Sequence, residues 1–133
     1  MSGEPSYGGM TVQLYVAERV AGRKFYTTLF GREPDFAPEE DFLEWRVADG
    51  TEFWVQMVAA EQRPLPTRLR FRVEDIAAAI AWSRTALGVD PSEPEDLPGV
   101  VRYTDFADPW GNRLGFYQDL DTSSNEAMRS AGS

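Results

Sequence analysis

Carboxylates, arginines and aromatic rings are the side chains with which this chain could do chemistry, because it contains no cysteine and no histidine. The lack of cysteine excludes disulfides and thiolate nucleophiles. The lack of histidine removes the commonest neutral metal ligand and the usual general base near neutral pH, so a Ser-His-Asp arrangement is impossible. Any acid–base step would therefore depend on a carboxylate such as Glu44 or Asp105.

Charged residues leave the sign of a ligand's charge open. Arg68, Arg70 and Arg72 alternate along one predicted strand and so share one face of it. They could bind an anion or pair with carboxylates elsewhere in the chain, and we favour pairing because an unpaired buried cation is costly. The acidic segments 35–41 and 93–96 would instead attract a cationic group, although such segments are most often solvated.

Aromatic residues provide surface for a planar ligand. Phe36 and Phe42 flank an acidic loop, Trp54 falls in a predicted strand, and Trp110 lies in an Asp-Pro-Trp-Gly-Asn turn. Rigid rings with scattered polar groups suit a planar or multi-ring molecule. Phe42 and Trp54 could equally be core residues, so the rings alone do not decide the function.

The elements that position these residues occur twice along the chain. Residues 11–16 and 68–73 alternate as half-buried strands, and each is followed by a helical pattern that ends at Gly31 or Gly88. Asp75 is the predicted N-cap of the second helix. The predicted buried face of the first helix contains Val20, Ala21, Phe25, Thr28 and Leu29, and that of the second contains Ile76, Ile80, Ser83 and Leu87.

Strand signals follow each helix. In the first unit, a short strand within 33–38 precedes a hairpin that turns at Asp49-Gly50. In the second unit, a proline-rich connection over 89–99 precedes strands at 100–107 and 113–120. By alternation, Gly115 and Tyr117 face the same side as the three arginines, while Leu114 and Phe116 face the core.

Length and charge bound the organisation of the chain. Its 133 residues suit one domain at 10–120, with module 1 at 10–59, a linker at 60–66 and module 2 at 67–120, between flexible tails at 1–9 and 121–133. No apolar run approaches the ~20 residues of a membrane span, and no secretory signal is visible. The formal net charge of −9 argues against nucleic acid and anionic membranes as partners. We therefore expect a cytoplasmic protein.

Three motifs in this duplicated frame resemble the vicinal oxygen chelate superfamily, which includes glyoxalases, bleomycin-resistance proteins and extradiol dioxygenases. They are Phe-Tyr-Thr-Thr-Leu-Phe-Gly at 25–31, the Asp49-Gly50 hairpin, and Phe-Ala-Asp-Pro-Trp-Gly-Asn within 106–118. The resemblance covers residues 10–120. It implies an α+β fold in which two βαβββ modules form a cupped mixed β-sheet with helices on the outside, and it implies a homodimer.

The resemblance also indicates where a catalytic metal would be bound. The family's ligand positions fall at Thr11, Gln56, Arg68 and Gly115, where the usual residues are histidine and glutamate. A permanent cation at Arg68 and the missing side chain of Gly115 do not suit a divalent ion. We therefore predict no metal and no cofactor, as in a metal-free, bleomycin-resistance-like branch, and we predict that Gly115 leaves room for a large ligand.

These arguments predict a protein that sequesters a small aromatic or drug-like molecule in a cleft between the modules, without catalysis. One alternative is an enzyme of the lyase, isomerase or dioxygenase type that uses a carboxylate base or non-standard metal ligands. Another is a domain whose filled cleft serves as a partner surface. No catalytic residue is assigned. The predicted ligand-binding residues are Phe36, Phe42, Trp54, Gln56, Arg68, Arg70, Trp110 and Tyr117.

Overall fold

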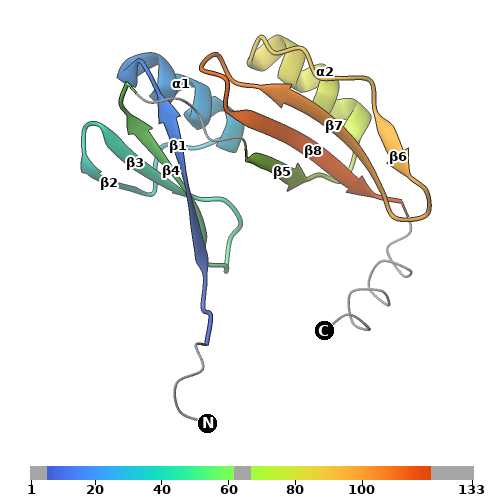
Figure 1. Ribbon diagram of the computed structural model, residues 1–133, viewed down its shortest axis with the longest axis horizontal. Coiled ribbons are helices and arrows are strands. Elements are labelled where there is room, and N and C mark those ends of the chain that lie inside the picture. The colour runs from blue at the N-terminus through green and yellow to red at the C-terminus, as the bar shows by residue number, and fades with distance from the viewer. Residues whose placement is uncertain (1–5, 62–66, 121–133) are drawn as a thin grey trace. The chain divides into compact units, whose positions relative to one another are not determined.

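A computed structural model describes residues 6–61 and 67–120 of the chain. These residues belong to two compact units that divide between residues 64 and 65, and each unit has the order strand, helix and three strands (Figure 1). The predicted single domain at 10–120 stays a prediction. Most of the predicted tails and of the linker lies outside the described residues.

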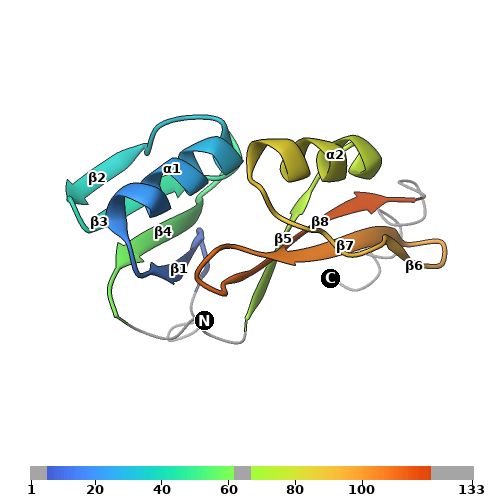
Figure 2. The same ribbon diagram turned by 90° about the horizontal axis from the view of Figure 1, so that it is seen from above.

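Unit 1 contains β1 (Met10–Val16), α1 (Arg19–Phe30), β2 (Phe36–Glu39), β3 (Phe42–Arg46) and β4 (Phe53–Ala59). Its sheet has the strand order β1-β4-β3-β2, in which β1 runs parallel to β4 and the other pairs are antiparallel. Helix α1 covers one face of this sheet (Figures 1 and 2). Leu14 and Val16 of β1 and Val55 and Met57 of β4 are buried, as the alternation predicts.

Unit 2 contains β5 (Arg68–Arg72), α2 (Ile76–Ala86), β6 (Glu95–Leu97), β7 (Val101–Ala107) and β8 (Arg113–Asp119). Its sheet repeats the pattern with the order β5-β8-β7-β6, and β5 runs parallel to β8. The predicted α+β fold with two βαβββ modules is confirmed, and each module forms its own four-stranded mixed sheet. Strand β6 falls within the segment that was predicted as a connection. Its three residues lie between two prolines and form a strand by pairing with β7.

The second helix begins at its predicted N-cap, and both helices end next to their predicted glycines. The carboxylate of Asp75 accepts a hydrogen bond from the backbone N–H of Ala78, and Glu18 does the same for Ala21. Gly31 and Gly88 follow the helices with φ of 74° and 68°, which is the left-handed conformation that glycine adopts most easily.

The buried face of α1 differs from its prediction. Gly22, Phe25 and Tyr26 are buried, whereas Val20 is 66% exposed and Ala21 is also exposed. Glycine carries no hydrophobic signal, yet it sets the closest approach of the helix, since a Cβ on Gly22 would lie 2.6 Å from Cγ2 of Val16. In α2, the predicted Ile76, Ile80 and Ser83 are buried.

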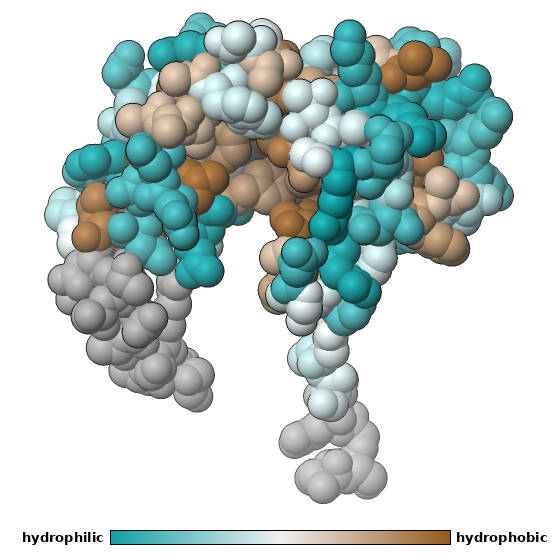
Figure 3. All heavy atoms as spheres, turned by 180° about the vertical axis from the view of Figure 1, so that it is seen from behind, coloured by the Kyte–Doolittle hydropathy of each residue, from teal (hydrophilic) through white to brown (hydrophobic). Residues whose placement is uncertain are grey.

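Hydrophilic side chains cover much of the visible surface of each unit, and hydrophobic residues are exposed in small patches (Figure 3). Within the described ranges, neither helix is both long and apolar enough to cross a membrane.

Candidate functional site

The face of the first sheet opposite α1 carries the candidate site, and we call it the helix-free face of unit 1. The strand registers place Gln13, Gln56 and Glu44 side by side across β1, β4 and β3, with Phe36 of β2 next to Glu44. In the next row, Trp54 lies between Thr11 and Arg46. A hairpin and a parallel first strand therefore bring together residues that are far apart in the sequence.

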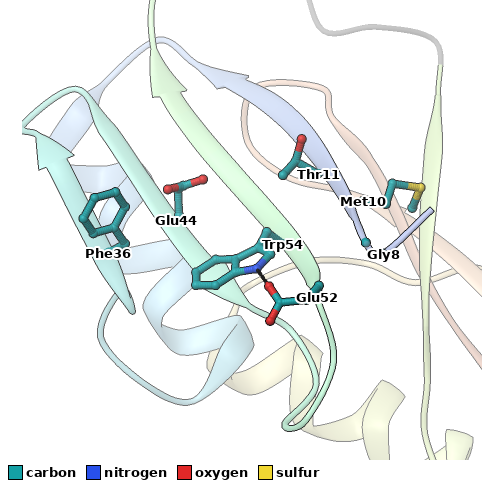
Figure 4. A pocket seen from close by; sticks show the side chains of 8 residues that line it. Gly8, Met10, Thr11, Phe36, Glu44, Glu52 and Trp54 are labelled. Carbon is teal, nitrogen blue, oxygen red and sulfur yellow. Dashed lines mark hydrogen bonds between the residues drawn. The ribbon is translucent and has the colours of Figure 1, made fainter. Parts of the chain in front are cut away.

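An open pocket of about 610 Å³ lies on this face. Figure 4 shows the carboxylate of Glu44 between the ring of Phe36 and the indole of Trp54, with Glu52 below the indole. Phe36 is 56% exposed, so its ring is available to a ligand. The lining residues are Gly8, Gly9, Met10, Thr11, Phe36, Glu44, Glu52 and Trp54.

A hydrogen-bonded row of side chains ends at Glu44. Tyr15 donates to Oε1 of Gln13 at 2.9 Å, Nε2 of Gln13 donates to Oε1 of Gln56 at 3.3 Å, and Nε2 of Gln56 donates to Oε1 of Glu44 at 2.7 Å. An ionised carboxylate can only accept, so its charge fixes the direction of both amides. The row therefore holds Glu44 in one orientation at the pocket and uses only one of its two carboxylate oxygens.

The other pocket carboxylate is already neutralised. Glu52 accepts a hydrogen bond from Nε1 of Trp54 at 2.9 Å and pairs with Arg46 at 3.2 Å. The Arg46 guanidinium also lies 4.9 Å from the centre of the Trp54 ring. Glu44, by contrast, has no arginine or lysine within ion-pair distance among the residues that the structure describes.

The corresponding face of unit 2 is occupied by ion pairs. Nε and Nη2 of Arg70 donate to the two oxygens of Asp105 at 2.8 and 3.0 Å, and the guanidinium lies 4.5 Å from the centre of the Tyr103 ring. These hydrogen bonds lower the pKa of Asp105 and raise that of Arg70, against the opposing effect of burial. Asp105 is therefore a weak base.

Arg68 is engaged in the same way. Its Nη1 donates to the carbonyl oxygen of Leu114 at 2.7 Å, and its Nε lies 3.6 Å from Oδ1 of Asp105. Of the two alternatives for the arginine strand, pairing is the one that the structure shows for Arg68 and Arg70.

Gly115 does not leave room for a ligand, so that prediction is wrong. A Cβ at this position would meet the carbonyl oxygen of Thr104 and would lie 2.9 Å from Oδ1 of Asp105 and 3.1 Å from Cγ of Arg70. The space is filled by the neighbouring strand and by the ion pair that crosses it.

The Asp-Pro-Trp-Gly-Asn turn between β7 and β8 is held together internally. The buried carboxylate of Asp108 accepts hydrogen bonds from the backbone N–H groups of Trp110 and Asn112 at 2.9 and 2.8 Å, and from Nδ2 of Asn112 at 2.7 Å. The motif therefore closes the β7–β8 hairpin. Trp110 itself is half-buried.

The four family positions for a metal do not fit a divalent ion in this chain. Gln56 is already bonded to Glu44, Arg68 presents a cation, and Gly115 has neither a side chain nor space for one. Thr11 offers only a neutral hydroxyl. Within 6–61 and 67–120, no three carboxylates come together in a way that could hold an ion.

The structure brings some of the predicted ligand residues together. Phe36 and Trp54 line the pocket, and Phe42 and Gln56 lie on the same face of the same sheet. Arg68, Arg70, Trp110 and Tyr117 belong to unit 2, and their role as ligand residues stays a prediction. Sequence reasoning named Glu44 only as a possible base or pairing partner, although its alternation with Phe42 already placed it on this face.

Comparison with family models and with curated protein sequences gives no match. Solved structures do match. A glyoxalase/bleomycin resistance protein from Catenulispora acidiphila is 24% identical, with 83% of this chain and 96% of that chain covered and a TM-score of 0.66. A bleomycin-binding protein from bleomycin-producing Streptomyces verticillus, complexed with copper(II)-bleomycin, is 21% identical, with 85% and 97% covered and a TM-score of 0.64. An oxidase, ChaP-H2, is 16% identical, with 88% and 97% covered and a TM-score of 0.68.

These similarities extend over most of this chain and nearly all of each of those three structures. Together with the two βαβββ units, they show that the chain has the vicinal oxygen chelate fold. The resemblance predicted from the sequence is confirmed at the level of the fold. Because that fold carries both binding proteins and enzymes, the function has to be argued from the site.

Proposed function

We propose that the chain binds a small aromatic or drug-like molecule on the helix-free face of unit 1 and sequesters it without making or breaking a bond. The observation that carries this proposal is the open pocket in which Phe36 and Trp54 stand on either side of Glu44. Exposed rings beside a fixed polar group are typical of sites for planar molecules. The bleomycin-binding neighbour supports the proposal by analogy, and the open pocket favours it over a purely structural partner surface.

The competing function is an enzyme with a carboxylate base. The hydrogen-bonded row that orients Glu44 favours this residue for such a role, whereas Arg70 and Arg68 make Asp105 a poor base. The oxidase among the structural neighbours keeps this alternative open. We give the enzyme second place because, among the described residues, the pocket offers one unpaired carboxylate, Glu44, while Glu52 is paired with Arg46.

The test is a thermal-shift experiment with a panel of ligands. The panel contains a cationic glycopeptide antibiotic, polycyclic aromatic acids, and manganese, nickel, zinc and ferrous ions. A ligand specific for the folded state stabilises it by about 2.7 kcal/mol at a hundredfold excess over Kd, which is readily measured. We expect a shift from an organic ligand and none from the metals.

Matched tryptophan variants locate the site. Trp54→Ala should abolish the shift because it removes one wall of the pocket, while Trp82→Ala removes a 43% exposed ring on α2 and should leave the shift intact. A shift from a metal ion would contradict the argument that the four family positions do not fit a divalent ion. The enzyme would then become the leading proposal. Turnover of a thiol adduct or catechol in the presence of a chelator would favour a metal-free enzyme.

We further propose that the chain forms a homodimer and acts in the cytoplasm, as the family resemblance and the acidic composition support. Light scattering should give twice the mass of one chain, and the mass of a single chain would contradict the dimer.

A further inference from the structure

The duplication supplies a counterpart for each residue of the helix-free face. Gln13 lies five residues before the N-cap Glu18 in unit 1, and Arg70 lies five residues before the N-cap Asp75 in unit 2. Gln13 and Arg70 therefore hold equivalent positions on equivalent first strands.

The equivalence extends across both sheets. In unit 1 the row that starts at Gln13 continues through Gln56 to Glu44. In unit 2 the row that starts at Arg70 continues through Gly115 to Asp105. Each row thus ends in a carboxylate on the third strand of its unit.

Unit 2 shows what satisfies such a carboxylate. The guanidinium of Arg70 forms two hydrogen bonds with Asp105 and lies over the ring of Tyr103. A planar cation that is held by a carboxylate on one side and an aromatic face on another is a favourable arrangement, since both interactions are electrostatic and act together.

Unit 1 has the carboxylate and the rings, but among the described residues no cation pairs with Glu44, because Arg46 on the same face pairs with Glu52 and lies over the Trp54 ring. The neutral Gln13 replaces the arginine, and Glu44 accepts one hydrogen bond from Gln56. Phe42 is the counterpart of Tyr103, and Phe36 and Trp54 add two further rings around Glu44. Glu44 is only half-exposed, so its charge is partly desolvated, and no side chain in the described part of the chain supplies a compensating cation.

We propose that unit 1 binds an organic cation, namely a planar aromatic molecule with a quaternary ammonium, protonated amine or guanidinium group, with Glu44 as its counter-ion. The equivalent place in unit 2 does not bind such a molecule, because Arg70 already fills it. This inference rests on the proposed function, and it adds the charge of the ligand and the choice between two equivalent faces.

The first experiment compares two probes of the same shape by fluorescence titration at slightly alkaline pH. 10-Methylacridinium carries a permanent charge, and acridine is neutral under these conditions. We expect the cation to bind more tightly. Glu44→Gln should weaken 10-methylacridinium about tenfold and leave acridine unchanged.

The matched control is the same type of change at the equivalent carboxylate. Asp105→Asn should leave both affinities unchanged, because that carboxylate serves Arg70 and Arg68. The melting temperature of each variant shows that it is folded at the temperature of the titration.

The second experiment rebuilds the arrangement of unit 2 within unit 1. The double variant Gln13→Arg with Gln56→Gly supplies an internal cation and the space that it needs to reach Glu44. Its affinity for 10-methylacridinium should be more than tenfold lower than that of the wild-type protein. The control, Gln13→Met with Gln56→Gly, makes the same space without a charge and should bind 10-methylacridinium at least tenfold more tightly than the arginine variant does.

The outcomes separate this inference from the proposed function. If acridine and 10-methylacridinium bind equally and Glu44→Gln changes neither, the cation site is overturned while the aromatic site stands. If Asp105→Asn weakens the cation as much as Glu44→Gln does, the assignment to unit 1 is overturned. If wild-type protein binds neither probe, the cation site is overturned, and the thermal-shift panel decides whether the proposed function stands.

Discussion

Gly115 allows an ion pair to cross the face of unit 2 because it has no side chain. We predict that Gly115→Ala lowers the free energy of unfolding by about 1–3 kcal/mol, the usual range for an added methyl group in a tightly packed place. The new Cβ would press on the backbone of Thr104, which cannot rotate away, and on the Arg70–Asp105 pair. Urea denaturation measures the change, and Gly8→Ala is the control because a Cβ on Gly8 meets nothing within 4 Å. Equal stability of the two variants would contradict the packing argument.

The Arg70–Asp105 pair also predicts a dependence of stability on pH. Arg70 lowers the pKa of the Asp105 carboxyl below its ordinary value of 3.8, so the folded state releases this proton more readily than the unfolded state. The resulting stabilisation is present above that ordinary value and is lost as the pH falls through the lowered pKa. The difference in unfolding free energy between wild type and Asp105→Asn should therefore be largest near neutral pH and should shrink below about pH 4. Urea denaturation at several pH values tests this, and a difference that is constant with pH would refute it.

At the scale of the elements, α1 is placed by a glycine. Alanine at position 22 would favour the helix itself by about 1 kcal/mol, yet its Cβ would lie 2.6 Å from Val16 and 3.0 Å from the sulfur of Met57. We predict that packing outweighs propensity and that Gly22→Ala is destabilising by about 1–2 kcal/mol. Lys24→Ala, at an exposed position on the same helix, should change stability by less than about 0.5 kcal/mol. Denaturant midpoints show whether packing or helix propensity prevails at this position. A more stable Gly22→Ala protein would show that α1 can move away from Val16 and Met57.

The helices and strands also show which features of the fold could be predicted from the sequence. Alternation in β1, β4 and β8 predicted the buried faces correctly, because a period of two leaves only one alternative. The buried face of α1 was misplaced by about one residue, since the contact that fixes it is made by Gly22, which has no hydrophobic signal. Strand β6 was missed because Glu95–Leu97 lies among prolines and is held by pairing with β7, a tertiary effect.

The candidate site was predicted only in part for a similar reason. Phe36 and Trp54 were recognised by residue type, and both line the pocket. The importance of Glu44 depends on which carboxylates have a cation beside them, and that requires the registers of three strands. The sequence could suggest that arginines pair with acids. It could not show that two arginines lie within ion-pair distance of Asp105, while no arginine of the described ranges does so for Glu44.

At the scale of the whole molecule, a duplicated fold presents two equivalent faces, and yet we predict that each chain binds one molecule of 10-methylacridinium. The second face holds its own cation, Arg70, which a ligand would have to displace from two hydrogen bonds. The net charge of −9 attracts a cation to the whole surface, so weak nonspecific binding has to be separated from the site. Salt does this, because at about 0.1 M ionic strength charges more than about 10 Å apart are largely screened. Isothermal titration at low and moderate salt should therefore give a weaker apparent affinity as salt rises but a constant ratio of one ligand per chain. A ratio of two at both salt concentrations would contradict this prediction. It would mean that the ligand displaces Arg70 from Asp105, and that the two units are alike in function as well as in fold.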